Sequence, residues 1–125
     1  MIKFSQEKAL FLHELLIEET GGSPGVRDYG LLDSALESAY ATFDGTDLYP
    51  SIEDKAAKIG YSLISNHSFV DGNKRIGMFV TICFLEVNGL RVNATNDDVI
   101  CAGLAVASGS MNYDRFKEWI IKITR

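Results

Sequence analysis

The chain is poor in proline, cysteine and histidine, with two of each among 125 residues. Two cysteines cannot form a disulfide framework, and no histidine lies near either one at metal-ligand spacing. We therefore expect Cys83 and Cys101 to be buried, reduced thiols. No segment approaches the ~18–20 apolar residues of a membrane span, and the charged N-terminal stretch does not have the form of a signal peptide. These absences predict a cytoplasmic protein without a membrane segment.

An excess of positive charge is also missing, because the formal net charge is −5. A general nucleic-acid binder usually carries a basic face, so this charge argues against direct contact with nucleic acid. A small basic site at Lys74 and Arg75 remains compatible with an acidic surface. The hydrophobic share of 46% and the charged share of 23% are ordinary for a globular protein, and the length suits one domain over residues 1–125.

Apolar residues recur at helical spacing along almost the whole chain. Ser51 and Asp54 have the spacing of a capping box, which marks a helix start. Asp44-Gly45 predicts a turn, with at most a short hairpin near residues 43–49. We therefore expect a compact all-α domain of about six helices. Their predicted positions are Ser5–Glu19, with Ala9, Leu12, Leu15 and Leu16 on one face; Leu31–Tyr40; Ser51–Ser65; a central apolar helix that Gly89 ends; a helix from Thr95 or Asn96; and one from Asn112.

A polar segment, NHSFVDGNKRIG at residues 66–77, leads into the predicted central helix. The start of a helix exposes unpaired N–H groups and the positive end of the helix dipole. Gly72 removes side-chain bulk there, and Asn73, Lys74 and Arg75 occupy the cap and first turn. Two cations oppose the dipole at this position, so their presence suggests a bound anion such as a phosphate.

The same segment holds a potential base and a potential metal ligand. His67 can take a proton from an attacking hydroxyl, and Asp71 is the kind of carboxylate that binds Mg²⁺ beside phosphate oxygens. Phe69 alternates with polar residues and is expected to point inward and fix the loop. These parts suit phosphoryl or nucleotidyl transfer. The residues alone leave a solvated Lys-Arg pair and a capped histidine as an equal alternative, and we expect the isolated His13 to be structural or at the surface.

The segment HSFVDGNKR resembles HxFx[DE]GNxR, the core motif of the Fic/Doc superfamily, and specifically of its death-on-curing (Doc) branch. The stretches GVRDYGLLDSAL, FDGTDLYPSIEDKAAKIGYSLISNH and FLEVNGL extend the resemblance over nearly the whole chain. It implies an all-α Fic fold and a cytoplasmic toxin that is paired with an antitoxin.

The resemblance also implies a role for each motif residue. His67 would activate the target hydroxyl, Asp71 would bind Mg²⁺, and Phe69 would be the structural anchor. The phosphates of ATP would be held by Gly72, Asn73, Lys74 and Arg75. A flap would pair its backbone with an extended stretch of the target protein; it consists of Phe43, Asp44, Gly45, Thr46, Asp47, Leu48 and Tyr49.

Two departures from the AMP-transferring members, which carry HPFxxGNGRxxR, concern the reaction type. Lys74 stands in place of a glycine, and Met78 in place of the last arginine. The Doc branch shares this arrangement, which implies ATP bound in the reversed sense with its γ-phosphate at the reacting position. The implied activity is a protein kinase that phosphorylates a threonine of elongation factor Tu and stops translation. The inhibitory motif [ST]xxxE[GN] of self-inhibited members has no match here, which implies a separate antitoxin bound in a groove lined partly by the first helices.

Three other functions remain open from the sequence. The nearest alternative is an AMP or other nucleotidyl transferase that uses the same residues. A second is a degenerate Fic fold that serves only to bind an antitoxin or another partner. A third is a phosphate-binding regulator that binds ATP and transfers nothing.

Overall fold

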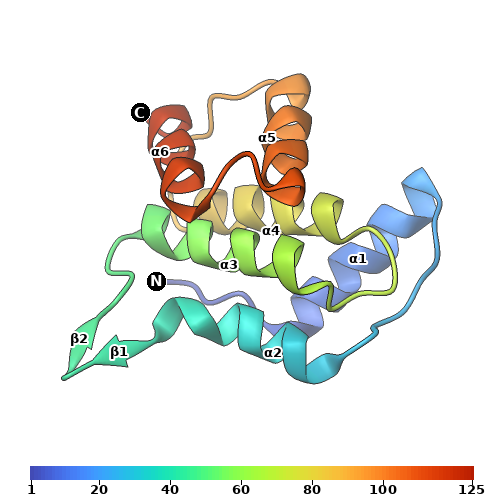
Figure 1. Cartoon of the computed structure of the whole chain (residues 1–125), viewed down its shortest axis with the longest axis horizontal. Helices are drawn as coiled ribbons and strands as arrows, with labels where there is room; N and C mark the ends of the chain where they lie inside the picture. Colours follow the sequence, from blue (N-terminus) through green and yellow to red (C-terminus); the bar gives the residue numbers. More distant parts are fainter.

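Two antiparallel helices, α3 (Ile52–Asn66) and α4 (Asn73–Val87), occupy the centre of the computed structural model, which describes residues 1–125. Figure 1 shows α1 and α2 on one side of this pair and α5 and α6 on the other. Six helices and one very small sheet confirm the predicted all-α class. The remaining elements are α1 (Gln6–Thr20), α2 (Tyr29–Glu37), the 3-10 helix η1 (Ser38–Tyr40), β1 (Thr42–Phe43), β2 (Thr46–Asp47), α5 (Asn96–Ser108) and α6 (Tyr113–Ile123).

Glycines let α3 and α4 approach each other closely. A Cβ atom added to Gly60 of α3 would lie 2.0 Å from Thr81 Oγ1 of α4, which is far inside van der Waals contact. A Cβ atom on Gly77 of α4 would lie 2.5 Å from Ile64 Cγ1 and 3.1 Å from the Gly60 carbonyl oxygen. The close crossing fixes how the two helices sit, and therefore where the loop that joins them can go.

One hydrophobic core extends from Phe4, before α1, to Ile120 of α6. Its largest fully buried side chains include Phe69, Phe84 and Phe116. Burying a side chain of this size contributes roughly 1.5–3 kcal/mol, so the core supplies the rigidity on which the α3–α4 loop rests. No helix in the structure has the length and apolar character needed to cross a membrane.

The predicted hairpin is present as β1 and β2, in which Phe43 pairs with Thr46. Asp44 and Gly45 form the turn with φ values of 56° and 78°, the left-handed pair that a two-residue hairpin turn needs. The buried Lys55 holds the base of the hairpin, because its ammonium group donates to the carbonyl oxygens of Ala39, at 3.3 Å, and of Tyr49.

Two expectations about burial are wrong. Leu15 is 42% exposed, and the buried face of α1 consists of Ala9, His13 and Ile17. The periodicity placed Leu15 inward because it lies among apolar neighbours, but α1 turns a different stripe toward α4. Cys101 is exposed on α5 and Cys83 is half-buried, so neither is the buried thiol that was expected. Apolar neighbours in the sequence did not predict burial here. Each helix buries only part of its circumference, so a residue within an apolar stretch can still lie on the exposed side.

Candidate active site

The loop between α3 and α4 begins and ends with a residue in the left-handed backbone region. His67 follows the last turn of α3 with φ 53° and ψ 49°, and Gly72 precedes α4 with φ 76° and ψ 19°. A non-glycine residue rarely adopts this conformation, although histidine does so more often than most. The two reversals let a short loop turn the chain from α3 into the antiparallel α4.

Backbone pairing with the α1–α2 connection holds this loop in place. Val26 and Phe69 form an antiparallel bridge, and the Val70 N–H donates to the Gly25 carbonyl at 3.1 Å. Arg27 binds the end of α3, because its Nε donates to the His67 carbonyl at 2.7 Å and its terminal nitrogen to the Asn66 carbonyl at 3.0 Å. The loop is therefore a fixed part of the fold.

Asn73 closes the loop from inside. Its side-chain oxygen accepts a hydrogen bond from the Phe69 N–H at 2.9 Å, and its side-chain nitrogen donates to the Phe69 carbonyl at 3.0 Å. The side chain is thus occupied within the loop, and what Asn73 can offer a phosphate is its backbone N–H. Phe69 itself is buried and stacks on the ring of His13, with the ring centres 3.9 Å apart.

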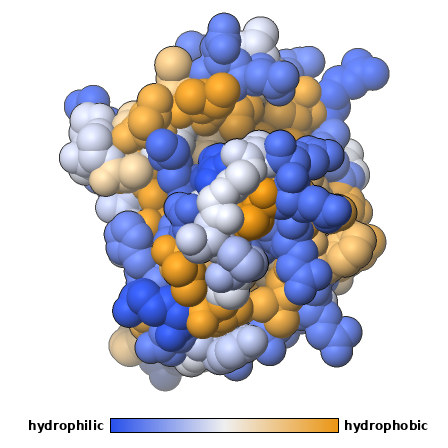
Figure 2. Space-filling model, turned by 90° about the vertical axis from the view of Figure 1, so that its right-hand side faces the viewer, coloured by the Kyte–Doolittle hydropathy of each residue, from blue (hydrophilic) through white to orange (hydrophobic).

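His67 presents an exposed side chain that makes no hydrogen bond within the protein, while its carbonyl oxygen is held by Arg27. A base must reach the proton that it removes, and a ring that is free on a fixed backbone can do so. Figure 2 faces the end of the molecule on which this loop lies and shows hydrophilic surface broken by separate hydrophobic patches.

Asp71 is held by two backbone N–H groups. Its Oδ1 accepts from Gly72 at 2.8 Å and its Oδ2 from Ser23 at 3.1 Å. The bond from Ser23, that from Gly72 and the nearby charge of Arg75 hold the pKa of Asp71 below its usual range, so the carboxylate is ionised at neutral pH.

The residues around Asp71 suit Mg²⁺ better than a metal that needs several protein ligands. No group of three acidic, histidine or cysteine side chains converges anywhere in the structure. Mg²⁺ is commonly bound by one or two carboxylates together with water and substrate phosphates, and Asp71 stands beside an anion-binding helix end. An ionised carboxylate with free lone pairs at this position fits that chemistry.

The start of α4 has no side-chain cap. Gly72 offers no side chain, and the N–H groups of Asn73, Lys74 and Arg75 have no hydrogen-bond acceptor in the structure. Every other α-helix has a capping side chain, supplied by Ser5, Asp28, Ser51, Thr95 and Asn112. Three free donors at the positive end of the helix dipole form a site for an anion.

The side chains of Lys74 and Arg75 leave this helix end in different directions. Arg75 hydrogen-bonds to the Thr20 hydroxyl at the end of α1. The aliphatic part of Lys74 lies against α5, where a Cβ atom on Gly103 would be 3.2 Å from Lys74 Cγ. Met78 is buried under the same glycine, at 2.9 Å from that Cβ position. The position that replaces the last arginine of the AMP-transferring motif is thus part of the core.

The predicted flap does not lie beside the loop. Lys55 ties the hairpin to the first turns of α3, whereas His67 follows its last turn, and Figure 1 shows the two at opposite ends of the helix. The 15 residues of α3 span about 22 Å at the usual helical rise. Phe43, at 74% exposure, and the exposed Leu48 project from the hairpin into solvent.

Several residues that shape the site were not predicted from the sequence: His13, Thr20, Gly22, Ser23 and Arg27. They come from α1 and the α1–α2 connection. A Cβ atom on Gly22 would lie 2.5 Å from Asp71 Oδ2, so a residue without a side chain is needed here to leave room for the carboxylate. The pair Gly21-Gly22 was visible in the sequence, but only as the end of a helix.

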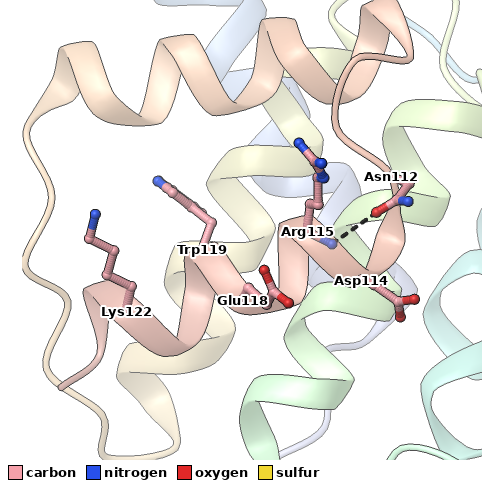
Figure 3. Close-up of a pocket in the computed structure, with 6 residues that line it drawn as sticks. All are labelled: Asn112, Asp114, Arg115, Glu118, Trp119 and Lys122. Carbon is pink, nitrogen blue, oxygen red and sulfur yellow. Dashed lines mark hydrogen bonds between the residues drawn. The ribbon is translucent and has the colours of Figure 1, made fainter.

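A surface hollow of about 570 Å³ lies elsewhere, on α6 (Figure 3). Its lining combines both signs of charge with one large aromatic side chain: Asn112, Asp114, Arg115, Glu118, Trp119 and Lys122. None of these residues belongs to the α3–α4 loop, so the hollow is not part of the site.

Comparison with known proteins shows three similarities. Residues 3–85 match the Fic/DOC family. The chain is 48% identical over 77 residues to a protein named Toxin Doc from Mycolicibacterium smegmatis, an alignment that covers 62% of this chain and 59% of that protein. It is 30% identical over 95 residues to a protein named Protein kinase doc from Escherichia phage P1, covering 74% of this chain and 72% of the phage protein. The chain thus spans less than two thirds of the mycobacterial relative.

Proposed function

This chain belongs to the Fic/DOC family, and we propose that it is the toxin of a type II toxin–antitoxin pair and acts in the cytoplasm as a protein kinase. Mg²⁺ and ATP are its cofactor and phosphate donor, and its target is a threonine of elongation factor Tu. The observation that carries the proposal is the uncapped start of α4. The loop that leads into it holds the exposed His67 and the ionised carboxylate of Asp71.

The chemistry would proceed around this helix end. The free N–H groups of Asn73, Lys74 and Arg75, with the two cationic side chains, would bind phosphate oxygens. His67 would take the proton from the target hydroxyl, whose oxygen attacks the γ-phosphorus while the bond to the departing ADP breaks. Mg²⁺ held at Asp71 would supply positive charge to the β- and γ-phosphate oxygens.

Transfer of phosphate rather than AMP is supported by Lys74 and Met78. A glycine at position 74 would leave room for phosphates along the start of α4, whereas the lysine side chain occupies the space between this helix end and α5. Met78 is buried and supplies no second cation. The name of the phage relative, which is 30% identical, points the same way. AMP transfer to a protein hydroxyl remains the alternative.

The target would be held as an extended segment. The hairpin formed by residues 42–47 could add a strand from the target to one of its edges, with Phe43 as an exposed apolar contact. The length of α3 separates the hairpin from His67, and about seven extended residues cover the same ~22 Å. A target segment bound at both places would therefore contact the hairpin some seven residues away from the hydroxyl that is phosphorylated.

An antitoxin segment would cover a separate apolar surface. Phe11 and Leu15 are both exposed and lie one turn apart on α1. An amphipathic helix that folds on binding could bury them, as helix-in-groove partners do. The exposure of Phe11 and Leu15 supports the proposal that the first helices line the antitoxin groove.

The deciding experiment is intact mass spectrometry of elongation factor Tu after incubation with the protein, Mg²⁺ and ATP. Phosphorylation adds about 80 Da to the target, whereas AMP transfer adds a far larger mass. A parallel reaction with ATP labelled at the α- or γ-phosphate distinguishes the two, because only the γ label follows a kinase. Label from the α-phosphate on the target would contradict the kinase proposal.

Two variants serve as controls for this experiment. His67→Ala should lower transfer by about 10²–10⁴-fold, the usual contribution of a general base. Lys122→Ala changes a charged residue of the α6 hollow and should transfer at the normal rate. Growth inhibition by His67→Ala equal to that by the wild type would favour a function in partner binding.

A further inference from the structure

His13 is the least expected member of the buried face of α1. It is 2% exposed and lies between Ala9 and Ile17 on that face. A polar ring is costly to bury unless it is hydrogen-bonded, and an apolar side chain could fill the same space. The ring is hydrogen-bonded, to a residue that is 58 positions away in the sequence.

The partner of His13 is the backbone of Asp71. His13 Nε2 lies 2.8 Å from the Asp71 carbonyl oxygen. A carbonyl oxygen only accepts, so Nε2 carries the hydrogen and donates it. The ring also stacks on Phe69 at 3.9 Å with an angle of 16° between the planes, which fixes its orientation.

These contacts fix the peptide group between Asp71 and Gly72 at both ends. Its carbonyl is held by His13, and its N–H, which belongs to Gly72, donates to Asp71 Oδ1 at 2.8 Å. A rotation of this peptide would break both bonds together. The orientation of this peptide therefore determines where the Asp71 carboxylate points and where the free N–H groups of α4 begin.

We propose that His13 is a positioning residue for the phosphate-transfer site, acting through its Nε2–H on the Asp71–Gly72 peptide. This inference rests on the proposed function, because it assigns Asp71 to Mg²⁺. Two further contacts hold the same part of the site: the Ser23 N–H, in the α1–α2 connection, donates to Asp71 Oδ2, and Arg75 donates to the Thr20 hydroxyl at the end of α1. α1 and the connection that follows it thus hold the carboxylate and one cation of the site at a fixed separation.

A matched pair of variants separates the donor from the ring. His13→Phe keeps the aromatic stack on Phe69 and removes the hydrogen bond. His13→Gln keeps an N–H donor of similar reach and removes the ring. The quantity to measure is the Mg²⁺ concentration that half-saturates binding of β,γ-imido-ATP, by calorimetry, alongside thermal unfolding and the kcat of transfer.

His13→Phe should raise the half-saturating Mg²⁺ concentration roughly 10-fold and lower kcat by a similar factor, as loss of an outer-shell hydrogen bond does at metal sites. His13→Gln should stay within about 3-fold of the wild type. A purely structural histidine would lower the unfolding temperature in both variants and leave Mg²⁺ binding unchanged. That result, or an equal Mg²⁺ shift in both variants, would overturn the proposal.

Measurements without nucleotide keep the inference separate from the proposed function. Long-range ¹H–¹⁵N spectra of the wild type should show His13 protonated at Nε2 and not at Nδ1. The amide hydrogen of Gly72, which donates to Asp71 Oδ1, should exchange with solvent faster in His13→Phe and at the wild-type rate in His13→Gln. The opposite tautomer would overturn the positioning role whether or not the protein is a kinase. If the tautomer is right and the wild type neither binds ATP nor transfers phosphate, the proposed function fails and the loop geometry stands.

Discussion

The two central helices begin in opposite ways. At the start of α3, the Ser51 hydroxyl accepts from the Asp54 N–H at 2.9 Å, and the Asp54 carboxylate accepts in return from the Ser51 N–H at 3.3 Å. Lys117 of α6 adds an ion pair to Asp54 at 2.7 Å. At the start of α4, a glycine precedes a first turn with two cations, and three N–H groups are left without acceptors.

The start of α3 stabilises the fold, whereas the start of α4 is arranged to bind a ligand. The acidic first turn of α3 complements the helix dipole, whereas Lys74 and Arg75 oppose it. The start of α4 therefore gives up the stability that a cap supplies, typically about 1 kcal/mol. An anion that fills the site would restore it. Each of the following experiments makes one helix end resemble the other, or measures how they differ.

The largest effect is expected from giving α4 an acidic first turn with Lys74→Glu. Phosphate transfer should fall by about 10²-fold or more, because a negative charge replaces a cation beside the phosphates. Thermal unfolding should nevertheless occur at the same or a higher temperature, since the new charge complements the helix dipole by about 0.3–1 kcal/mol. Kinetics and calorimetry on the same preparation test both parts, and a variant that is both active and destabilised would contradict this account of α4.

The reverse change at α3 should affect stability alone. Ser51→Ala removes the acceptor for the Asp54 N–H and should lower the free energy of unfolding by about 1 kcal/mol. Denaturant unfolding measures this loss, and Ser34→Ala, which changes an exposed serine of α2 whose hydroxyl makes no hydrogen bond within the protein, provides a control. The rate of transfer well below the unfolding temperature should not change. A loss of transfer in Ser51→Ala would show that the start of α3 also contributes to the site.

The ends of the helices could be predicted from the sequence because caps are local. Ser51 and Asp54 are three residues apart, so the pattern that defines a capping box contains both partners, and the structure confirms it. Asp44-Gly45 predicted a turn for the same reason. The polar loop before α4 was also recognisable, because the residues that it places at the start of the helix are consecutive.

The supports of the site could not be predicted, because their partners are far apart in the sequence. Ser23 and Asp71 are 48 positions apart, and His13 is 58 positions from the same residue. Nothing near His13 completes a site, so the sequence suggested only a structural or surface residue. The separation of the hairpin from His67, in contrast, follows from chain order, because the hairpin directly precedes α3 and His67 directly follows it. Local pattern predicts what an element is, and packing decides what it faces.

Acid should weaken the cap of α3 in a way that depends on Asp54. Partial burial alone would raise the pKa of Asp54, but the hydrogen bonds from Lys117 and Ser51 outweigh it and lower the pKa below its usual value. The carboxylate therefore contributes stability that is complete above the unfolded pKa of about 3.9 and is lost as the pH falls through the lower folded value. Asp54→Asn should show a smaller decrease of the unfolding free energy from pH 5 downward. An identical pH dependence in both proteins would mean that other carboxylates account for the acid sensitivity.

The smallest expected effect is stabilisation by sulfate, which tests whether the uncapped start of α4 binds an anion. Sulfate should stabilise the wild type by filling the uncapped start of α4, and a concentration equal to its Kd adds about 0.4 kcal/mol by mass action. Sulfate also stabilises folded proteins in general by exclusion from their surface, so the shift must be compared with that of Lys74→Glu in the same buffer. The general effect is common to both proteins. The difference between their sulfate-induced shifts in unfolding temperature, measured at equal ionic strength, therefore reports binding at the site.

A difference between the two shifts that grows with sulfate concentration and then saturates indicates one binding site at this helix end. Equal shifts at every concentration would mean that the free N–H groups of α4 are satisfied by water alone, and the contrast with α3 would then lose its functional meaning.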